Sequence, residues 1–225
     1  MVTIAKTNKY HELVVRHLEL LRLYSTISEL RLHTNSAIDS GIARFYLNRV
    51  INNYPGFFVP ALDSMRSYFY IALRSYIGAY YERQTDAVRL TKTDKYSLGK
   101  YLNDGSRLTR KKKALKAFEG MVKNNKKELE LLKNLRHSVA HFETKVSINS
   151  KMIFGDSKTI QILNSLGDVL YLLGYQPGNK PHHFSYDNNY ADEVRSLIDE
   201  LSPSNKEYSD LRSQYLKKRL EWIVR

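Results

Sequence analysis

Hydrophobic positions recur at helical spacing along most of the first two-thirds of the chain. From position 10 to about 33 they follow one another at intervals of three, four and seven residues, as on one face of an α-helix. This face consists of Leu13, Leu20, Leu23, Ile27 and Leu30, widened by Leu18, Leu21 and Tyr24. The pattern predicts a long first helix with a broad buried stripe.

Two more helices are predicted on either side of a Tyr-Pro-Gly turn signal at 54–56. Thr-Asn-Ser at 34–36 offers N-cap side chains for a helix over 37–53. After the turn, apolar positions predict a third helix from Phe58 to about Arg83. Its expected core positions are Leu62, Phe69, Leu73, Tyr76, Ile77 and Tyr80.

The second half begins with a polar connector over 91–106, which contains a possible short helix at 97–102. A helical pattern then runs over 107–142, as one helix or as two joined near 123–125. Its apolar positions are Leu115, Phe118, Val122, Leu129, Leu132, Leu135 and Val139. An extended segment is expected at 146–153, and another helix at 158–174 should bury Ile160, Leu163, Leu166, Leu170 and Leu173.

Two C-terminal helices, near 190–201 and from 206 to the end, complete the prediction. Because no segment alternates well enough to demand a large sheet, the predicted class is all-α. With 225 residues, we expect one domain over 1–225. Its core should span about 37–175, and a helical extension should follow over 176–225.

Positive charge is concentrated in one stretch. The chain carries a net charge of +13, and nine cations face only Glu119 between positions 107 and 127. Such a cluster predicts salt-dependent attraction to RNA or another polyanion, although a solvated surface helix would also account for it. The nine cations are Arg107, Arg110, Lys111, Lys112, Lys113, Lys116, Lys123, Lys126 and Lys127.

Cysteine is absent, which excludes disulfides and thiolate metal sites and suits a reducing cytoplasm. The N-terminus lacks the apolar segment of a secretory signal. The most apolar stretch, 57–81, contains Asp63, Arg66 and Arg74, so it is expected to be a buried helix and not a membrane span. We therefore expect a cytoplasmic protein without a membrane partner.

The candidate chemistry lies at the end of the basic helical stretch, where Arg136, His137 and His141 follow a Leu-rich run. Helical spacing predicts a core-facing side made of Leu131, Leu132, Leu135, Val139 and Phe142, with the Arg and both His on the other half. A permanent cation beside an imidazole could cleave RNA: the imidazole moves a proton and the guanidinium holds the phosphate.

Two other interpretations of these residues stay open. His137 and His141 could share a metal ion, but Ser138 stands where the glutamate of a zincin helix would be, and no third ligand is evident. Alternatively, all three are ordinary exposed residues of an amphipathic helix. No glycine-rich phosphate loop is present, so the sequence predicts neither a nucleotide cofactor nor a metal.

The segment Leu-Arg-His-Ser-Val-Ala-His-Phe at 135–142 resembles the R-x(4)-H motif of the HEPN superfamily, in particular its abortive-infection branch. The upstream order is also similar: a long helix, Asp86, a short helix near 97–102 and then the motif helix. The resemblance covers roughly 10–200 and implies an up-and-down helical bundle with extra N- and C-terminal helices.

The resemblance further implies a homodimer that joins two motifs in one composite site, with metal-independent endoribonuclease activity in antiphage defence or as a toxin. Arg136 would hold the phosphate, His141 would be the acid or base, and His137 would orient the pair. Position 143 is Glu, where HEPN toxins paired with nucleotidyltransferase antitoxins carry Tyr, which puts regulation through that residue in doubt. An antitoxin or other regulatory protein is a further expected partner. The alternative function is a non-catalytic HEPN module that binds nucleic acid, nucleotide or a partner protein.

Overall fold

The computed structural model describes residues 3–34, 55–91, 96–104, 109–140, 155–174, 184–187, 192, 193 and 196. Four predicted elements therefore lie outside the described residues: the helix at 37–53, the extended segment at 146–153 and, for nearly all their length, the two C-terminal helices. The chain divides into two compact units, one made of Met1–Leu21 with Ser67–Tyr186 and the other of Arg22–Arg66 with Asp187–Arg225.

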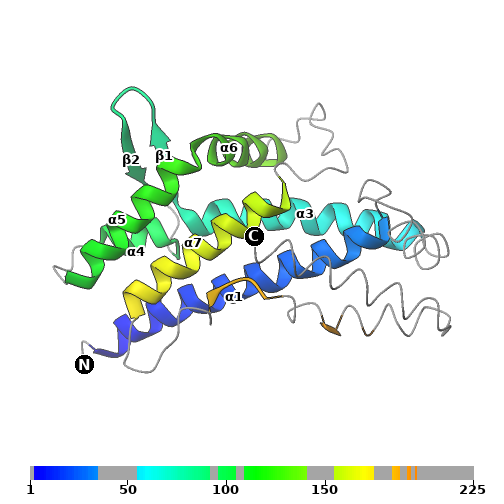
Figure 1. The fold of residues 1–225 in the computed structure, drawn as a ribbon, viewed down its shortest axis with the longest axis horizontal. Coiled ribbons are helices and arrows are strands. Elements are labelled where there is room, and N and C mark those ends of the chain that lie inside the picture. The colour runs from blue at the N-terminus through cyan, green and yellow to red at the C-terminus, as the bar shows by residue number, and fades with distance from the viewer. Residues whose placement is uncertain are drawn as a thin grey trace. The chain divides into compact units, whose positions relative to one another are not determined.

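Helices make up most of the described chain, which confirms the all-α class (Figure 1). The elements are α1 (Thr3–Thr34), α3 (Pro55–Ile77), β1 (Ala79–Glu82), β2 (Ala87–Leu90), α4 (Leu98–Asn103), α5 (Thr109–Asn124), α6 (Lys126–Ala140) and α7 (Asp156–Gly174). Within the described ranges, no helix is both long enough and apolar enough to cross a membrane.

The predicted stripe of α1 is largely buried. Leu13, Leu20, Ile27 and Leu30 are buried as expected, whereas Leu23 is only half-buried. The same side of the helix also buries polar residues, among them His17. In the first unit, His17 stacks at a tilt on Tyr76 of α3, with 5.9 Å between the ring centroids. The N-terminal part of α1 is also tied to α7, because the Tyr10 hydroxyl donates a hydrogen bond to the carbonyl of Leu170 at 3.1 Å.

Helix α3 ends at Ile77, six residues before the predicted end, and a β-hairpin follows. Gly78 adopts a left-handed φ of 58°, and its N–H donates to the Arg74 carbonyl at 3.2 Å, which closes the last helical turn. Strands β1 and β2 then pair antiparallel, from Ala79 opposite Leu90 to Glu82 opposite Ala87. The predicted burial of Tyr80 is accordingly wrong: this residue lies on β1 and is 37% exposed.

The short helix predicted at 97–102 is confirmed as α4. Ser97 caps it, since its hydroxyl accepts a hydrogen bond from the Lys100 N–H at 3.2 Å. Gly78 and Gly99 let the end of α3 and the start of α4 come very close: a Cβ at Gly99 would overlap the Gly78 carbonyl oxygen.

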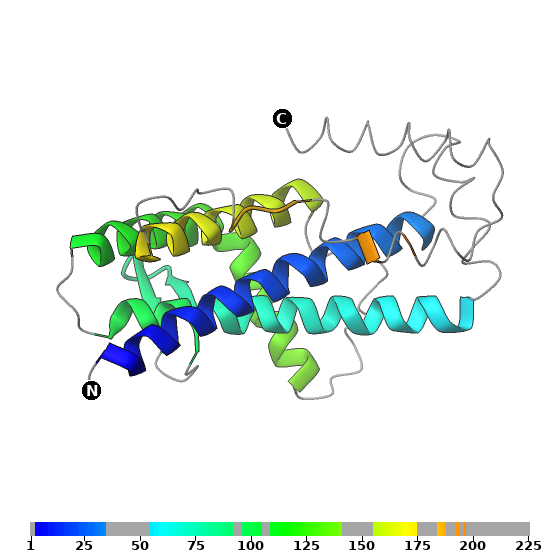
Figure 2. The ribbon, with the colours of Figure 1, turned by 90° about the horizontal axis from the view of Figure 1, so that it is seen from below.

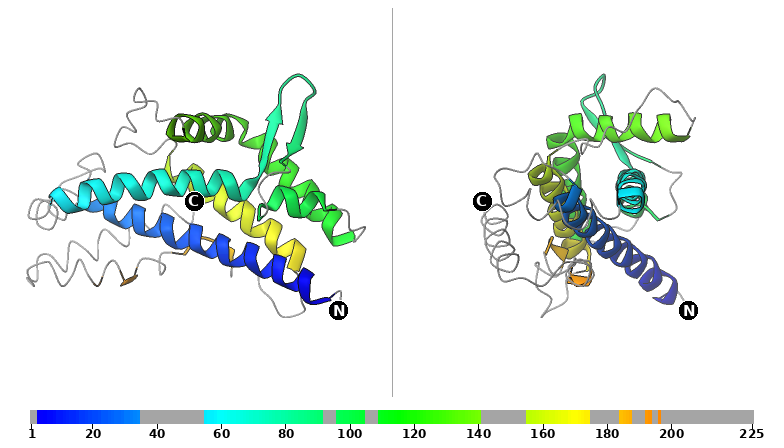
Figure 3. Two further views of the ribbon diagram at one scale, coloured as in Figure 1. Left: turned by 180° about the vertical axis from the view of Figure 1, so that it is seen from behind. Right: turned by 90° about the vertical axis from the view of Figure 1, so that its right-hand side faces the viewer.

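The helical stretch after residue 107 is two helices, broken where the sequence suggested. Asn125 separates α5 from α6, and its side-chain amide donates to the Met121 carbonyl at 2.7 Å. Helix α5 packs along α7, whose predicted core residues Leu163, Leu166 and Leu170 are buried (Figure 2). The hairpin β1–β2 contacts both α5 and α6 (Figure 3). This arrangement brings the hairpin to the junction of the two basic helices.

Candidate nucleic-acid interface

Four lysines of the basic stretch are exposed on α5. The apolar residues Ala114, Phe118 and Val122 are buried and recur every four positions, which fixes the side of α5 that faces the core. The opposite side therefore faces solvent. It carries Lys112, Lys113, Lys116 and Lys123, all exposed.

Lys111 differs from these lysines because it lies on the core side of α5, three residues before Ala114 and seven before Phe118. It is buried, and its ammonium donates to the carbonyl oxygen of Asp104 and sits 5.5 Å from the centre of the Tyr101 ring. Its charge is thus engaged inside the protein, unlike that of its neighbours. The helical spacing of Ala114 and Phe118 could have indicated this from the sequence.

Two exposed lysines contact the hairpin at the α5–α6 junction. Lys123 forms an ion pair with Asp86 at 3.6 Å, and the Lys126 ammonium lies 5.2 Å from the centre of the Tyr81 ring. The Tyr81 hydroxyl in turn donates a hydrogen bond to the Asp86 carboxylate. Lys127, the next residue of α6, is exposed. The hairpin therefore places one carboxylate and one phenol among the lysines, a contact that charge counting along the sequence did not predict.

The electrostatics of Asp86 follow from these contacts. The hydrogen bond from Tyr81 and the charges of Lys123 and Lys126 lower the pKa of Asp86. The same hydrogen bond raises the pKa of Tyr81. Asp86 is therefore a carboxylate and Tyr81 a neutral hydrogen-bond donor near neutral pH.

On α6, the core-facing side agrees with the prediction at two positions and differs at one. Leu129 and Leu132 are buried, but Leu131, which was expected in the core, is 46% exposed.

The candidate catalytic residues lie at or beyond the limit of the described side chains. The backbone of Arg136 and His137 belongs to α6, whereas His141 lies outside the described residues. Of the basic residues, Arg110 is described only as backbone of α5, and Arg107 is not described.

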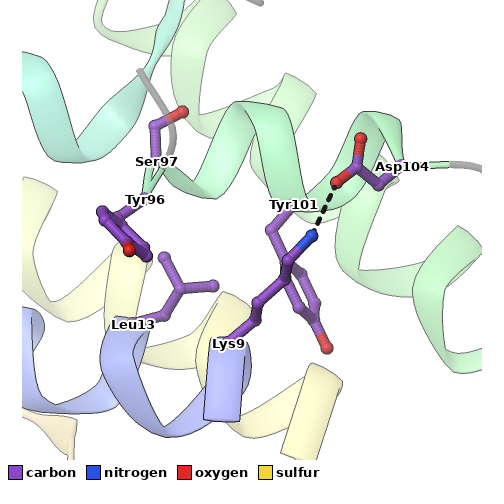
Figure 4. A pocket seen from close by; sticks show the side chains of 6 residues that line it. All are labelled: Lys9, Leu13, Tyr96, Ser97, Tyr101 and Asp104. Carbon is purple, nitrogen blue, oxygen red and sulfur yellow. Dashed lines mark ion pairs between the residues drawn. The ribbon is translucent and has the colours of Figure 1, made fainter. Parts of the chain in front are cut away.

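A small, shallow pocket, open to solvent, lies between α1 and α4 (Figure 4). An ion pair between Lys9 and Asp104, at 3.5 Å, spans one side of it. Leu13, Tyr96, Ser97 and Tyr101 complete the lining. None of the residues predicted to act on RNA lines this pocket, so the sequence-based hypothesis gains no support from it.

In the described part of the chain, no group of three His, Asp or Glu side chains could hold a metal ion. The question whether His137 and His141 share a metal falls beyond that part. Searches with models of protein families, among curated proteins and among solved structures found no match to this chain.

Proposed function

We propose that this protein binds RNA on the solvent face of α5 and α6 and cleaves it without a metal ion at Arg136 and His141. The observation that carries the proposal is the one-sided display of lysine. Exposed lysines run along α5 and continue at the start of α6, the helix that also bears Arg136. They are Lys112, Lys113, Lys116, Lys123, Lys126, Lys127 and Lys133.

Several of these lysines are free to meet a phosphate backbone. Among the described residues, Lys112, Lys113, Lys116 and Lys127 form no ion pair, and Glu119 is the single acidic residue of α5. A polyanion that binds there releases its counterions and gains affinity without reading sequence. This property suits a nuclease that must attract RNA before it cleaves.

The proposed cleavage uses groups that need no cofactor. Arg136 would bind the scissile phosphate and stabilise its developing charge. His141 would accept the 2′-hydroxyl proton or protonate the leaving 5′-oxygen, and His137 would orient the pair. The products would be a 2′,3′-cyclic phosphate and a 5′-hydroxyl.

The HEPN resemblance supplies the rest of this proposal. It favours a homodimer in which two motifs form one composite site. It also favours a cytoplasmic role in antiphage defence or as a toxin, restrained by an antitoxin or another regulatory protein. These features rest on the motif at 135–142 and on the order of the helices before it.

A non-catalytic RNA-binding module is the second candidate. The observation that favours it is the lysine display itself, which is sufficient for binding whether or not Arg136 and His141 react. The two candidates share the RNA interface and differ in whether bound RNA is cut.

The shared interface is tested by fluorescence anisotropy of a labelled 20-nucleotide RNA at several salt concentrations. We compare Lys112→Ala/Lys116→Ala with a control of equal charge change, Lys100→Ala/Lys158→Ala, on α4 and α7. Removal of two phosphate contacts should flatten the plot of log affinity against log salt by about 1.4 units. Equal effects of the two double variants, or no RNA binding by the wild type, would overturn the proposed interface.

A further inference from the structure

One anionic position at the α5–α6 junction has several groups arranged around it. The Asp86 carboxylate occupies this position, with the Tyr81 hydroxyl bonded to it and the Lys123 ammonium 3.6 Å away. Lys126 sits over the ring of the same tyrosine at 5.2 Å. A hydroxyl donor and two ammonium groups around one anion are the groups that bind a phosphate.

The backbone gives an independent reason to consider Asp86. Its φ is 49°, in the left-handed region, at the last residue of the four-residue turn between β1 and β2. Gly is the residue that adopts this conformation without strain. The chain instead places a carboxylate there, and its side chain turns back to Tyr81 and Lys123.

The ion pair between Asp86 and Lys123 is exposed, so another anion can replace the carboxylate. The Asp86 side chain is 76% exposed and that of Lys123 is 47% exposed. Exposed pairs of this kind are weak, so another anion can displace the carboxylate at little cost. The face of α5 that carries Lys112 and Lys116 leads to Lys123, so a nucleic-acid backbone bound along that face would pass the hairpin.

We propose that Asp86 occupies a binding position for an RNA backbone phosphate, formed by Tyr81, Lys123 and Lys126, and that bound RNA displaces it. This inference rests on the proposed RNA interface and extends it to one phosphate position and its intramolecular competitor. The ligand is a phosphodiester of the RNA backbone, and the hairpin is part of the interface.

Asp86→Asn is the direct test, because it removes the charge and retains the rest of the turn. Asn tolerates left-handed φ as Asp does, and its side-chain oxygen can still accept the Tyr81 hydrogen bond. The matched control is Glu119→Gln, an equal charge change on the lysine face of α5. Both variants are titrated with fluorescein-labelled 20-nucleotide oligouridine at constant salt, after circular dichroism shows that they are folded.

Asp86→Asn should raise the affinity about two- to fivefold, the range that release of an exposed ion pair permits, and more than Glu119→Gln does. In a Lys123→Ala background, the gain from Asp86→Asn should fall to the level of the control. The slope of log affinity against log salt should stay the same in Asp86→Asn, because the phosphate contact forms in both proteins and only its intramolecular competitor is removed.

Equal gains from Asp86→Asn and Glu119→Gln would overturn the inference, as would a gain that persists without Lys123. In either case, the proposed RNA interface would still be supported if the wild type binds RNA and Lys112→Ala/Lys116→Ala weakens that binding. If the wild type does not bind oligouridine at all, the proposed RNA interface fails and the phosphate position fails with it.

Discussion

The Nε2 atom of His17 lies 2.7 Å from the carbonyl oxygen of Phe184, which follows it by 167 residues in the sequence. Because a carbonyl oxygen only accepts hydrogen bonds, the neutral imidazole carries its proton on Nε2. Nδ1 is then the unprotonated nitrogen, and it is buried with no hydrogen-bond partner in the described part of the protein. His17 thus joins α1 to the segment after α7 as a neutral, buried donor.

This contact predicts a loss of stability in mild acid. Burial lowers the pKa of His17 to about 4, from 6.5 in the unfolded chain. Between these values the unfolded state binds the extra proton, so the free energy of unfolding falls as pH drops from 6.5 to 4. The expected loss is about 3 kcal/mol, measured by urea denaturation across this pH range.

His17→Phe should remove this part of the pH dependence, because it retains a ring and removes the titrating group. His11→Gln is the control, since His11 is exposed on the same helix. If the wild type and His17→Phe lose stability in parallel below pH 6.5, the buried neutral His17 is not the cause.

Gly78→Ala should destabilise the first unit by about 2 kcal/mol or more. Alanine at a φ of 58° is strained, and its Cβ would overlap the Ser97 hydroxyl oxygen. Gly120→Ala, within α5, meets no atom within 4 Å and should stabilise the protein by up to about 1 kcal/mol. Thermal or urea denaturation distinguishes the two, and equal effects would contradict the close approach of α3 and α4.

Substitution of Lys111 should affect mainly stability, whereas substitution of its neighbour Lys112 should affect mainly RNA affinity. Lys111→Met leaves the Asp104 carbonyl without its donor, so it should lower stability by about 1–2 kcal/mol. Its effect on RNA affinity should be smaller than that of Lys112→Met. Lys112→Met should weaken RNA binding and leave stability within about 0.5 kcal/mol of the wild type. Urea denaturation and RNA anisotropy are measured on both variants. The prediction fails if Lys112→Met loses more stability than Lys111→Met, or if Lys111→Met loses more RNA affinity than Lys112→Met.

Leu131 provides a test of the proposed homodimer. It is a large apolar residue exposed on the helix that bears Arg136. If the dimer forms around this helix, Leu131→Asp should shift sedimentation velocity from dimer to monomer while helical circular dichroism is retained. A wild type that sediments as a monomer at every concentration would contradict the composite site.

The helices were predictable because their apolar spacing reflects the core they form. The spacing of Leu13, Leu20 and Ile27 predicted which side of α1 is buried. The polar run at 123–125 predicted the break between α5 and α6. The hairpin was missed because the apolar pattern of α3 continues into Tyr80, although Gly78 marks the end of the helix.

The sequence could not indicate which charges meet across the fold. Asp86 and Lys123 are far apart in the sequence, and only the packing of the hairpin on the helix junction brings them together. Leu131 was expected in the core because it lies in a Leu-rich run, but only its neighbours Leu129 and Leu132 are buried. The motif at 135–142 was visible as a pattern, but its side chains lie outside the described set.

The most direct test of the account is cleavage of a labelled RNA in excess chelator. Wild type is compared with His141→Ala and Arg136→Ala, all shown to be folded and to bind the RNA. We expect only the wild type to release fragments that end in 2′,3′-cyclic phosphate, because only it retains both groups of the proposed site. Cleavage that disappears with the chelator, or that His141→Ala retains in full, would contradict metal-independent catalysis at Arg136 and His141.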